Sequence, residues 1–384
     1  MVPPLPDSAN PSLVLAHPTP QEQLRIWSQT HPSWGSTYPI DAYLDREKYL
    51  LSAPLARAGG ITPWILTTSP SDPARPVLAS CETLRKPALL RRGNGPVCHV
   101  AAHGIASVFT YPDLRRRGYA ARMLSLIAHH LAHQEESSPG TASFSVLFSD
   151  IGPLYYAALG WKPFESTHLM FAVPERALVN DAPPHVRTIL AHDLPALAER
   201  DVELLAHRIA LLPTQPSKTF VALAPTLEAL QWHFAREAFL STHLFSAVPD
   251  VHGALYTPPE SPHARVWALW TRTQTGGKSD PDKNVMDIIR FVLEDQDAIS
   301  DAQLSTALML IIHEAQAQAR QWLCSKIIMW NPDARLKAVV EATKHLDSSF
   351  VVRQLDSITS LRCFSRHVSA ADMEWVDNQK FGWC

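Results

Sequence analysis

The spacing of hydrophobic and polar residues in the first half of the chain predicts helices mixed with strands. Leu24 and Trp27 lie three residues apart in one amphipathic segment, and Tyr43, Leu44 and either Tyr49 or Leu50 recur at helical spacing in the next. Runs rich in β-branched and aromatic residues predict the strands. Helices are predicted over 18–31, 39–53, 117–133 and 151–160, and strands over 63–69, 76–86, 98–110, 143–150 and 161–174.

The second half of the chain shows a similar order of elements. Gly276 and Gly277 lie in a polar loop between two apolar runs, which is typical of a hairpin. The expected elements are a linker and helix over 181–210, a strand and helix over 219–242, hairpin strands over 264–273 and 284–295, helices over 302–323 and 333–346, and strands over 326–331 and 350–364. The repeated order predicts an α/β protein of two lobes, 1–180 and 181–384.

Composition supports two globular lobes and limits the partners. The chain has 384 residues, of which 46% are hydrophobic and 18% charged, which is typical of a folded protein too long for one ordinary core. The formal net charge of −3 gives no general attraction to nucleic acid. The five cysteines are scattered without metal-ligand spacing, so we expect reduced thiols and no metal. Without a signal-peptide pattern or an apolar run of about 18 residues, we expect a cytoplasmic protein that does not span a membrane.

A cationic helix start is the strongest chemical signal in the sequence. Residues 107–124, SVFTYPDLRRRGYAARML, pass from a strand through a proline turn to three arginines and Gly118. Cations at a helix N-terminus are unfavourable unless an anion binds there. Gly118 allows close approach of the backbone to a phosphate, and Ala120 is nearly as small. The pattern Arg115-x-x-Gly118-x-Ala120 therefore predicts a pyrophosphate site.

With the element order and the later motif YYAALGW, this signature resembles the GNAT N-acetyltransferase superfamily over residues 15–175. The segments ASCETLRKPAL, GIASVFTYPDLRRRGYAARML and TLEALQWHFAREAF are similar to the fungal lysine N-acetyltransferase family, which acetylates the side-chain amine of free lysine. The resemblance implies a GNAT fold that uses acetyl-CoA. The second half lacks the signature, and its acidic segment LEDQDAISDAQLS would repel a pyrophosphate, so we expect a degenerate GNAT-like lobe and one cofactor site.

In such a fold, the strand before the signature diverges from its neighbour and offers free backbone groups to the pantetheine arm of acetyl-CoA. The pyrophosphate is expected on the backbone N–H groups of 116–121, with charge-assisted contacts from the arginines. The predicted cosubstrate residues are Val108, Phe109, Thr110, Arg115, Arg116, Arg117, Gly118, Tyr119, Ala120 and Ala121.

Acetylation of an amine requires a base for the ammonium and an acid for the leaving thiolate. The resemblance places the acid on Tyr156, and the unknown rotation of the short helix leaves Tyr155 as the other candidate. Histone-type members of the superfamily carry a glutamate where this chain has Gly104. His103 beside it and Glu82 on the previous strand are therefore the candidate bases, and a water relay is a third option.

A lysine acceptor needs an acidic partner for its amine and a basic or N–H partner for its carboxylate. The acidic candidates are Asp41, Asp45, Glu82 and Glu165. We expect the acceptor pocket between the two lobes. The second lobe offers five large side chains near it, which in proteins are more often part of a core than in contact with a ligand, namely Trp232, His233, Arg236, Trp267 and Trp270. The aromatic chain end ADMEWVDNQKFGWC predicts a docked tail, and the resemblance to other two-lobed acyltransferases suggests that its carboxylate reaches the active site.

The sequence thus predicts an acetyl-CoA-dependent N-acetyltransferase that acts by direct attack in a ternary complex, because no cysteine lies in a motif for a covalent intermediate. Free lysine is the expected acceptor, and a polyamine, an amine-bearing toxin or a protein lysine are alternatives. A non-catalytic acyl-CoA-binding sensor is the alternative from another class, favoured by Gly104 and opposed by Tyr156.

Overall fold

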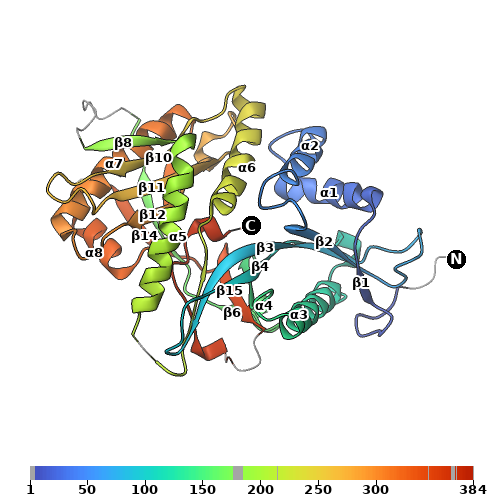
Figure 1. Ribbon diagram of the computed structural model, residues 1–384. Helices are drawn as coiled ribbons and strands as arrows, with labels where there is room; N and C mark the ends of the chain where they lie inside the picture. Colours follow the sequence, from blue (N-terminus) through green and yellow to red (C-terminus); the bar gives the residue numbers. More distant parts are fainter. Residues whose placement is uncertain are drawn as a thin grey trace.

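A computed structural model describes residues 5–175, 185–213, 215–344, 346–364, 368 and 370–383, so the expected lobe boundary at 180/181 lies outside the described residues. The chain forms two sheets with helices packed on them (Figure 1). The first-half elements are β1 (Val14–Ala16), α1 (Pro20–Trp34), α2 (Ile40–Leu50), β2 (Ile61–Thr67), β3 (Ala79–Arg92), β4 (Cys98–Phe109), α3 (Tyr119–Ser137), β5 (Phe144–Ser149), α4 (Leu154–Ala157), β6 (Lys162–Pro163) and β7 (Thr167–Ala172).

The second half contributes a matching series of elements. They are β8 (Val186–Leu190), α5 (Leu194–Leu211), β9 (Thr219–Leu223), α6 (Leu227–Phe245), β10 (Val251–Tyr256), β11 (Val266–Thr273), β12 (Val285–Leu293), α7 (Asp301–Gln321), β13 (Lys326–Trp330), α8 (Ala334–Ala342), β14 (Ser348–Val352), β15 (Ile358–Cys363), β16 (Met373–Trp375) and the 3-10 turn η5 (Lys380–Gly382). The predicted hairpin is confirmed as the antiparallel pair β11–β12. The predicted helix and strand within 219–242 are α6 and β9.

The two sheets have the same strand order. The first runs β1-β2-β3-β4-β5-β15-β6, and the second, read from its other end, runs β8-β10-β11-β12-β13-β7-β14. In both, the fourth and fifth strands pair in parallel, β4 with β5 and β12 with β13. Two further strands, β9 and β16, extend the first sheet beside β3. The repeated order confirms the two-lobe α/β arrangement.

The sixth strand of each sheet comes from the other half of the chain. The sequence predicts single strands over 161–174 and 350–364, and both predictions are wrong. The segment 161–174 divides into β6 in the first sheet and β7 in the second, and the segment 350–364 divides into β14 in the second sheet and β15 in the first. At the two breaks, Phe164 N–H donates to Thr359 O over 2.8 Å, and Ser357 has a φ of +53°, which a continuous strand does not tolerate.

The cores lie where helices cover the sheets. Helix α3 packs Met123, Leu124, Ile127 and Leu131 on the first sheet, and each of these side chains is at most 2% exposed. Burial of each contributes about 1.5 to 3 kcal/mol. This stripe fixes the N-terminus of α3 at the end of β4, where the cosubstrate is expected.

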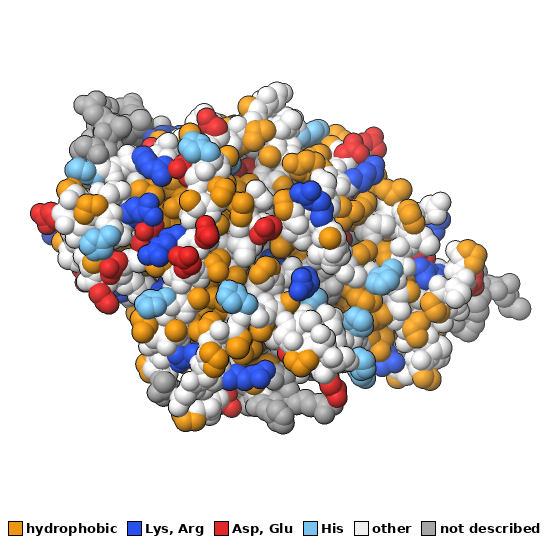
Figure 2. Space-filling view, in the orientation of Figure 1, with side chains coloured by type: hydrophobic (Ala, Val, Ile, Leu, Met, Phe, Trp, Pro, Cys, Tyr) orange, Lys and Arg blue, Asp and Glu red, His pale blue; other side chains and the backbone are white. Residues whose placement is uncertain are grey.

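The outer surface carries both charge signs. On the face shown in Figure 2, Lys and Arg side chains alternate with Asp and Glu side chains, and no single sign covers the face. None of the helices in the described part of the chain is long and apolar enough to cross a membrane.

Candidate active site

A pocket opens where β4 and β5 separate. The two strands pair only from Ala102 to Gly104, and beyond Gly104 they diverge as the sequence predicts. The pocket has a volume of about 710 Å³, within the usual size of a small-molecule site. It lies between the lobes, and its walls come from α1, α2, β3, β4, β5, α4, α6, the end of β11 and the C-terminal tail.

The first turn of α3, where the sequence predicts an anion site, has no side-chain cap. Gly118 precedes the helix with a φ of +78°, and no side chain caps the first turn, which leaves N–H groups for a ligand or solvent. Arg116 also has a positive φ, +63°, and backbone of this kind directs successive N–H groups to one point. The three arginines 115–117 are exposed. A Cβ atom on Gly118 would lie 2.7 Å from Ser8 Oγ, so the N-terminal segment lies against this turn.

The predicted cosubstrate residues take different positions around this turn. Val108 lines the pocket, whereas Phe109 and Thr110 do not, and the Phe109 ring packs against Trp34. Tyr119 is buried and donates its hydroxyl hydrogen to Pro6 O over 2.6 Å. Ala120 and Ala121, in the first turn of α3, are partly buried.

Glu82 lies in the pocket wall beside Ser107. The Ser107 hydroxyl donates to Glu82 Oε2 over 3.0 Å, and its backbone has a strained φ of +53° where β4 bulges against β3. Burial, followed by the charge of Glu47, raises the pKa of Glu82 from 4.5 to about 7, while the Ser107 hydrogen bond and the charge of Arg236 oppose this rise. A carboxyl group with a pKa near neutrality suits a general base.

His103, the other candidate base, does not line the pocket. Its side chain is buried, and Nε2 lies 3.3 Å from Thr141 O in the loop before β5. Burial lowers the pKa of His103 to about 4. Its surroundings fit a neutral histidine that joins β4 to this loop.

Of the two tyrosines on α4, Tyr156 lines the pocket and Tyr155 does not. The two rings meet edge to face with centroids 5.1 Å apart. Tyr155 lies on the solvent side of this pair, where its side chain is 37% exposed. Burial, together with the charges of Tyr155 and Asp150, raises the pKa of Tyr156 well above its ordinary value. Its hydroxyl therefore stays protonated at neutral pH.

The acidic residues that line the pocket differ from those the sequence predicts for the acceptor. Among the acidic candidates only Glu82 lines it, whereas Asp41, Asp45 and Glu165 are exposed elsewhere. Arg46 and Glu47 on α2 were missed, and they form an ion pair in the wall. Both occur three and four residues after Tyr43, on the buried face of the helix, and charged residues on an apolar face are the signal that was available.

The residues named on the other lobe divide into two groups. Trp232 and Arg236, on α6, line the pocket. His233, Trp267 and Trp270 are buried in the core, as the sequence predicts for this type of residue. The His233 Nε2 atom lies 2.9 Å from Phe381 O.

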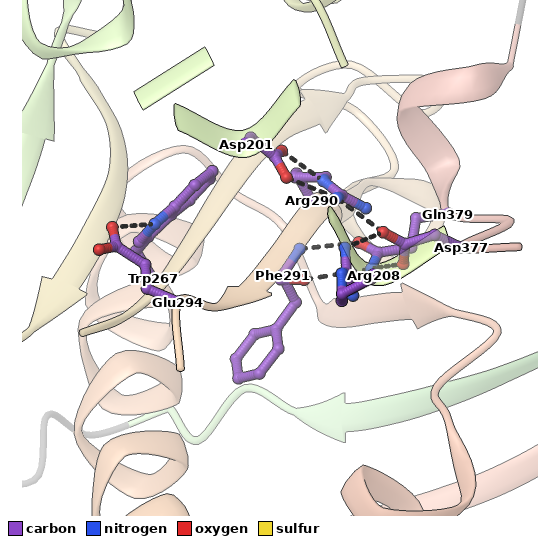
Figure 3. A network of polar contacts seen from close by, with 8 residues as sticks. All are labelled: Asp201, Arg208, Trp267, Arg290, Phe291, Glu294, Asp377 and Gln379. Carbon is purple, nitrogen blue, oxygen red and sulfur yellow. Dashed lines mark hydrogen bonds and ion pairs between the residues drawn. The ribbon is translucent and has the colours of Figure 1, made fainter. Parts of the chain in front are cut away.

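The C-terminal tail is docked, as predicted, and Trp383 lines the pocket. Asp377 accepts ion-pair contacts from Arg208 and Arg290, each over 2.7 Å, and Arg290 also pairs with Asp201 (Figure 3). These contacts hold η5 beside α6 in the middle of the molecule (Figure 1). The terminal residue, Cys384, lies outside the described residues.

The tail also fills the second lobe's equivalent of the β4–β5 gap. The β12–β13 pairing ends at Ile288, and just beyond it the Gln379 side chain bonds to Phe291 N over 2.8 Å and Phe291 O over 3.1 Å (Figure 3). In the first lobe, the residue three positions beyond the last pair at Gly104 is Ser107. Helix α7 is capped by Ser300 and begins with Asp301, so its N-terminus does not favour an anion.

The described residues contain no group of three or more His, Cys, Asp or Glu side chains that could hold a metal ion. None of the four described cysteines lines the 710 Å³ pocket. Burial raises the pKa of Cys81, which lies beside Glu82, well above its ordinary value. Its thiol is therefore protonated at neutral pH and is a poor nucleophile.

Comparisons with known proteins agree with this architecture. Residues 170–384 match the model of the LYC1 GNAT-like C-terminal domain. A lysine acetyltransferase of Yarrowia lipolytica is 23% identical over 418 residues, covering 95% of this chain and 98% of that protein. An Enterococcus faecalis protein of unknown function, described as a probable N-acyltransferase, has a TM-score of 0.54 at 11% identity, covering 92% of this chain and 73% of that one. Saccharomyces cerevisiae N-myristoyltransferase with bound myristoyl-CoA has a TM-score of 0.53 at 10% identity, covering 94% and 81%.

Proposed function

Since the chain belongs to the LYC1 GNAT-like family and is an N-acetyltransferase by that membership, we propose that it transfers the acetyl group of acetyl-CoA to the side-chain amine of free lysine. The observation that carries this proposal is the pocket between the lobes, in which Glu82 and Tyr156 meet the diverging end of β4. The lysine acetyltransferase of Yarrowia lipolytica, similar over 95% of this chain, supports the choice of acceptor.

The cosubstrate is proposed to bind along β4 and at the start of α3. The backbone beyond Gly104 has no β5 partner and is available to the amide groups of the pantetheine arm. The uncapped first turn after Gly118 and the three arginines 115–117 provide N–H groups and positive charge for the pyrophosphate. The second lobe offers no such place, because Gln379 fills its gap, so we propose one cosubstrate per chain.

The proposed mechanism is direct attack of the amine on the acetyl carbonyl. Glu82, ionised above pH 7, removes the proton from the lysine ammonium, directly or through a water molecule. A C–N bond forms and the C–S bond breaks. Tyr156, which stays protonated, donates its hydroxyl hydrogen to the sulfur as negative charge develops there. The buried, protonated Cys81 argues against a covalent acyl intermediate.

The experiment that tests this function measures release of the CoA thiol from acetyl-CoA by the purified protein. Free lysine, other amino acids, polyamines and lysine-containing peptides are compared as acceptors. We expect saturable release with free lysine, and mass spectrometry should place the acetyl group on its side-chain nitrogen. Turnover of polyamines or peptides alone would overturn the acceptor and keep the reaction, whereas tight acetyl-CoA binding without any turnover would identify an acyl-CoA sensor.

A further inference from the structure

One cation in the pocket makes no direct ion pair with a described residue. Arg236 projects from α6 into the pocket wall and is partly buried. Its guanidinium lies 4.9 Å from the centroid of the Trp383 ring. Within the described residues, it forms no hydrogen bond or ion pair with any group. A buried cation without such a partner is unfavourable unless a ligand provides one.

The other charged groups of the pocket have partners. Arg46 is paired with Glu47 and donates a hydrogen bond to the Tyr38 hydroxyl. Asp150, at the end of β5, accepts a hydrogen bond from Ser357 N over 2.9 Å. Glu82 accepts a hydrogen bond from Ser107, and the proposed function assigns it to the reacting amine. Arg236 is the remaining charge without an assigned partner among the described pocket residues.

We propose that Arg236 binds the α-carboxylate of the acceptor, so that the pocket selects a free amino acid over amines that lack this group. The inference rests on the proposed transfer of acetyl to an amine in this pocket. It deepens that function by excluding polyamines and lysine residues within a protein chain, neither of which carries a carboxylate at that position.

The chemistry of the surrounding groups fits this ligand. A guanidinium offers two parallel N–H donors that match the two oxygens of a carboxylate. Burial lowers the pKa of Arg236, the nearby positive charge of Arg46 lowers it further, and the charge of Glu47 opposes this. A carboxylate beside both arginines relieves their repulsion, while Glu47 offers a negative charge to the α-ammonium of the same amino acid. The Trp383 ring, in the C-terminal tail, makes a cation–π contact with this guanidinium.

The test compares lysine, lysinamide and cadaverine as acceptors for the wild-type protein and Arg236→Met. Lysinamide replaces the carboxylate by a neutral amide, and cadaverine keeps both amines of lysine but lacks the carboxyl group altogether. For the wild type, we expect kcat/KM for lysine to exceed the values for both other amines by about 100-fold, as for a buried charge-assisted contact. In Arg236→Met, we expect the lysine value to fall about 100-fold and the cadaverine value to stay within about threefold. Arg57→Met, an exposed arginine outside the pocket, should behave as the wild type.

Cadaverine turnover and acetyl-CoA affinity report whether Arg236→Met is folded. If this variant does not fold, the wild-type comparison of lysine with lysinamide decides, because it needs no substitution. Equal turnover of lysine and lysinamide would overturn the inference and leave the acetyltransferase function intact. Equal losses for lysine and cadaverine in a folded Arg236→Met protein would also overturn it. A wild-type protein that acetylates none of the three amines would overturn the proposed function itself.

Discussion

Replacement of Glu82 by glutamine separates its chemical role from its effect on stability. The rise of its pKa from 4.5 to about 7 corresponds to roughly 3.5 kcal/mol, at about 1.4 kcal/mol per pKa unit. Below about pH 4, the carboxyl is protonated in both the folded and the unfolded protein. Between pH 4.5 and 7 only the unfolded chain ionises, so the wild type loses stability as pH rises, and above pH 7 the loss is complete.

In the Glu82→Gln protein, the side chain at position 82 is neutral at every pH, so its stability should not fall as the pH rises through this range. We expect its free energy of unfolding, relative to the wild type, to increase by about 2 to 3 kcal/mol between pH 5 and pH 8. Its kcat should fall by roughly 100-fold or more, the low end for loss of a general base. The wild-type kcat/KM should rise with pH to a midpoint near 7, and this rise should disappear in the variant.

The assays are urea unfolding at several pH values and CoA release with lysine over the same range. Glu165→Gln, an exposed acid outside the pocket, is the matched control and should change neither profile. A Glu82→Gln protein with wild-type turnover and an unchanged midpoint would show that another group accepts the proton. If the stabilities of the wild type and Glu82→Gln depend on pH in the same way, the pKa of Glu82 is not raised in the folded protein. Glu82 is then ionised at neutral pH, and the argument that burial raises its pKa is refuted.

Three further substitutions test the remaining parts of the site. Tyr156→Phe should lower kcat about 100-fold with little change in acetyl-CoA affinity; an unchanged kcat would exclude Tyr156 as the acid. Gly118→Asp should weaken acetyl-CoA binding at least tenfold by calorimetry, because it adds negative charge at the uncapped first turn of α3. Gly59→Asp, at a φ of +80° with open space around it, controls for backbone strain. Equal affinities in the two variants would contradict the proposed pyrophosphate site at this turn. Trp383→Ala should raise KM for lysine about tenfold and leave acetyl-CoA affinity unchanged, whereas an unchanged KM would remove the tail from the acceptor site.

Local patterns predicted most elements because their cause is local. The α3 stripe from Met123 to Leu131 follows helical spacing, and Gly118 with its arginines marks the helix start whatever the rest of the chain does. The same holds for the β11–β12 hairpin, whose apolar strands flank a loop with two glycines. The divergence of β4 from β5 was predicted from the resemblance and is observed beyond Gly104.

The missed features depend on residues far apart in the sequence. No local pattern shows that β7 and β15 lie in opposite sheets, because both are ordinary apolar strands. Likewise, Glu82 is one of several acids in the sequence, and its raised pKa follows from burial and then from the charge of Glu47. Arg236 resembles a surface residue of an amphipathic helix until α2 and Trp383 are placed beside it. These properties arise from packing between the lobes.

The exchange of β7 and β15 has a consequence for synthesis on the ribosome. β5 is complete at Ser149, but its neighbour β15 is made roughly 200 residues later. At 5–20 residues per second, the nascent first lobe waits about 10 to 40 s with an open strand edge. Such an edge is a template for wrong pairing, so a chaperone that covers β5 until release should raise the yield. A ribosome stalled after residue 200 should display a first lobe that is still sensitive to protease, because the strand that closes its sheet has not yet been translated.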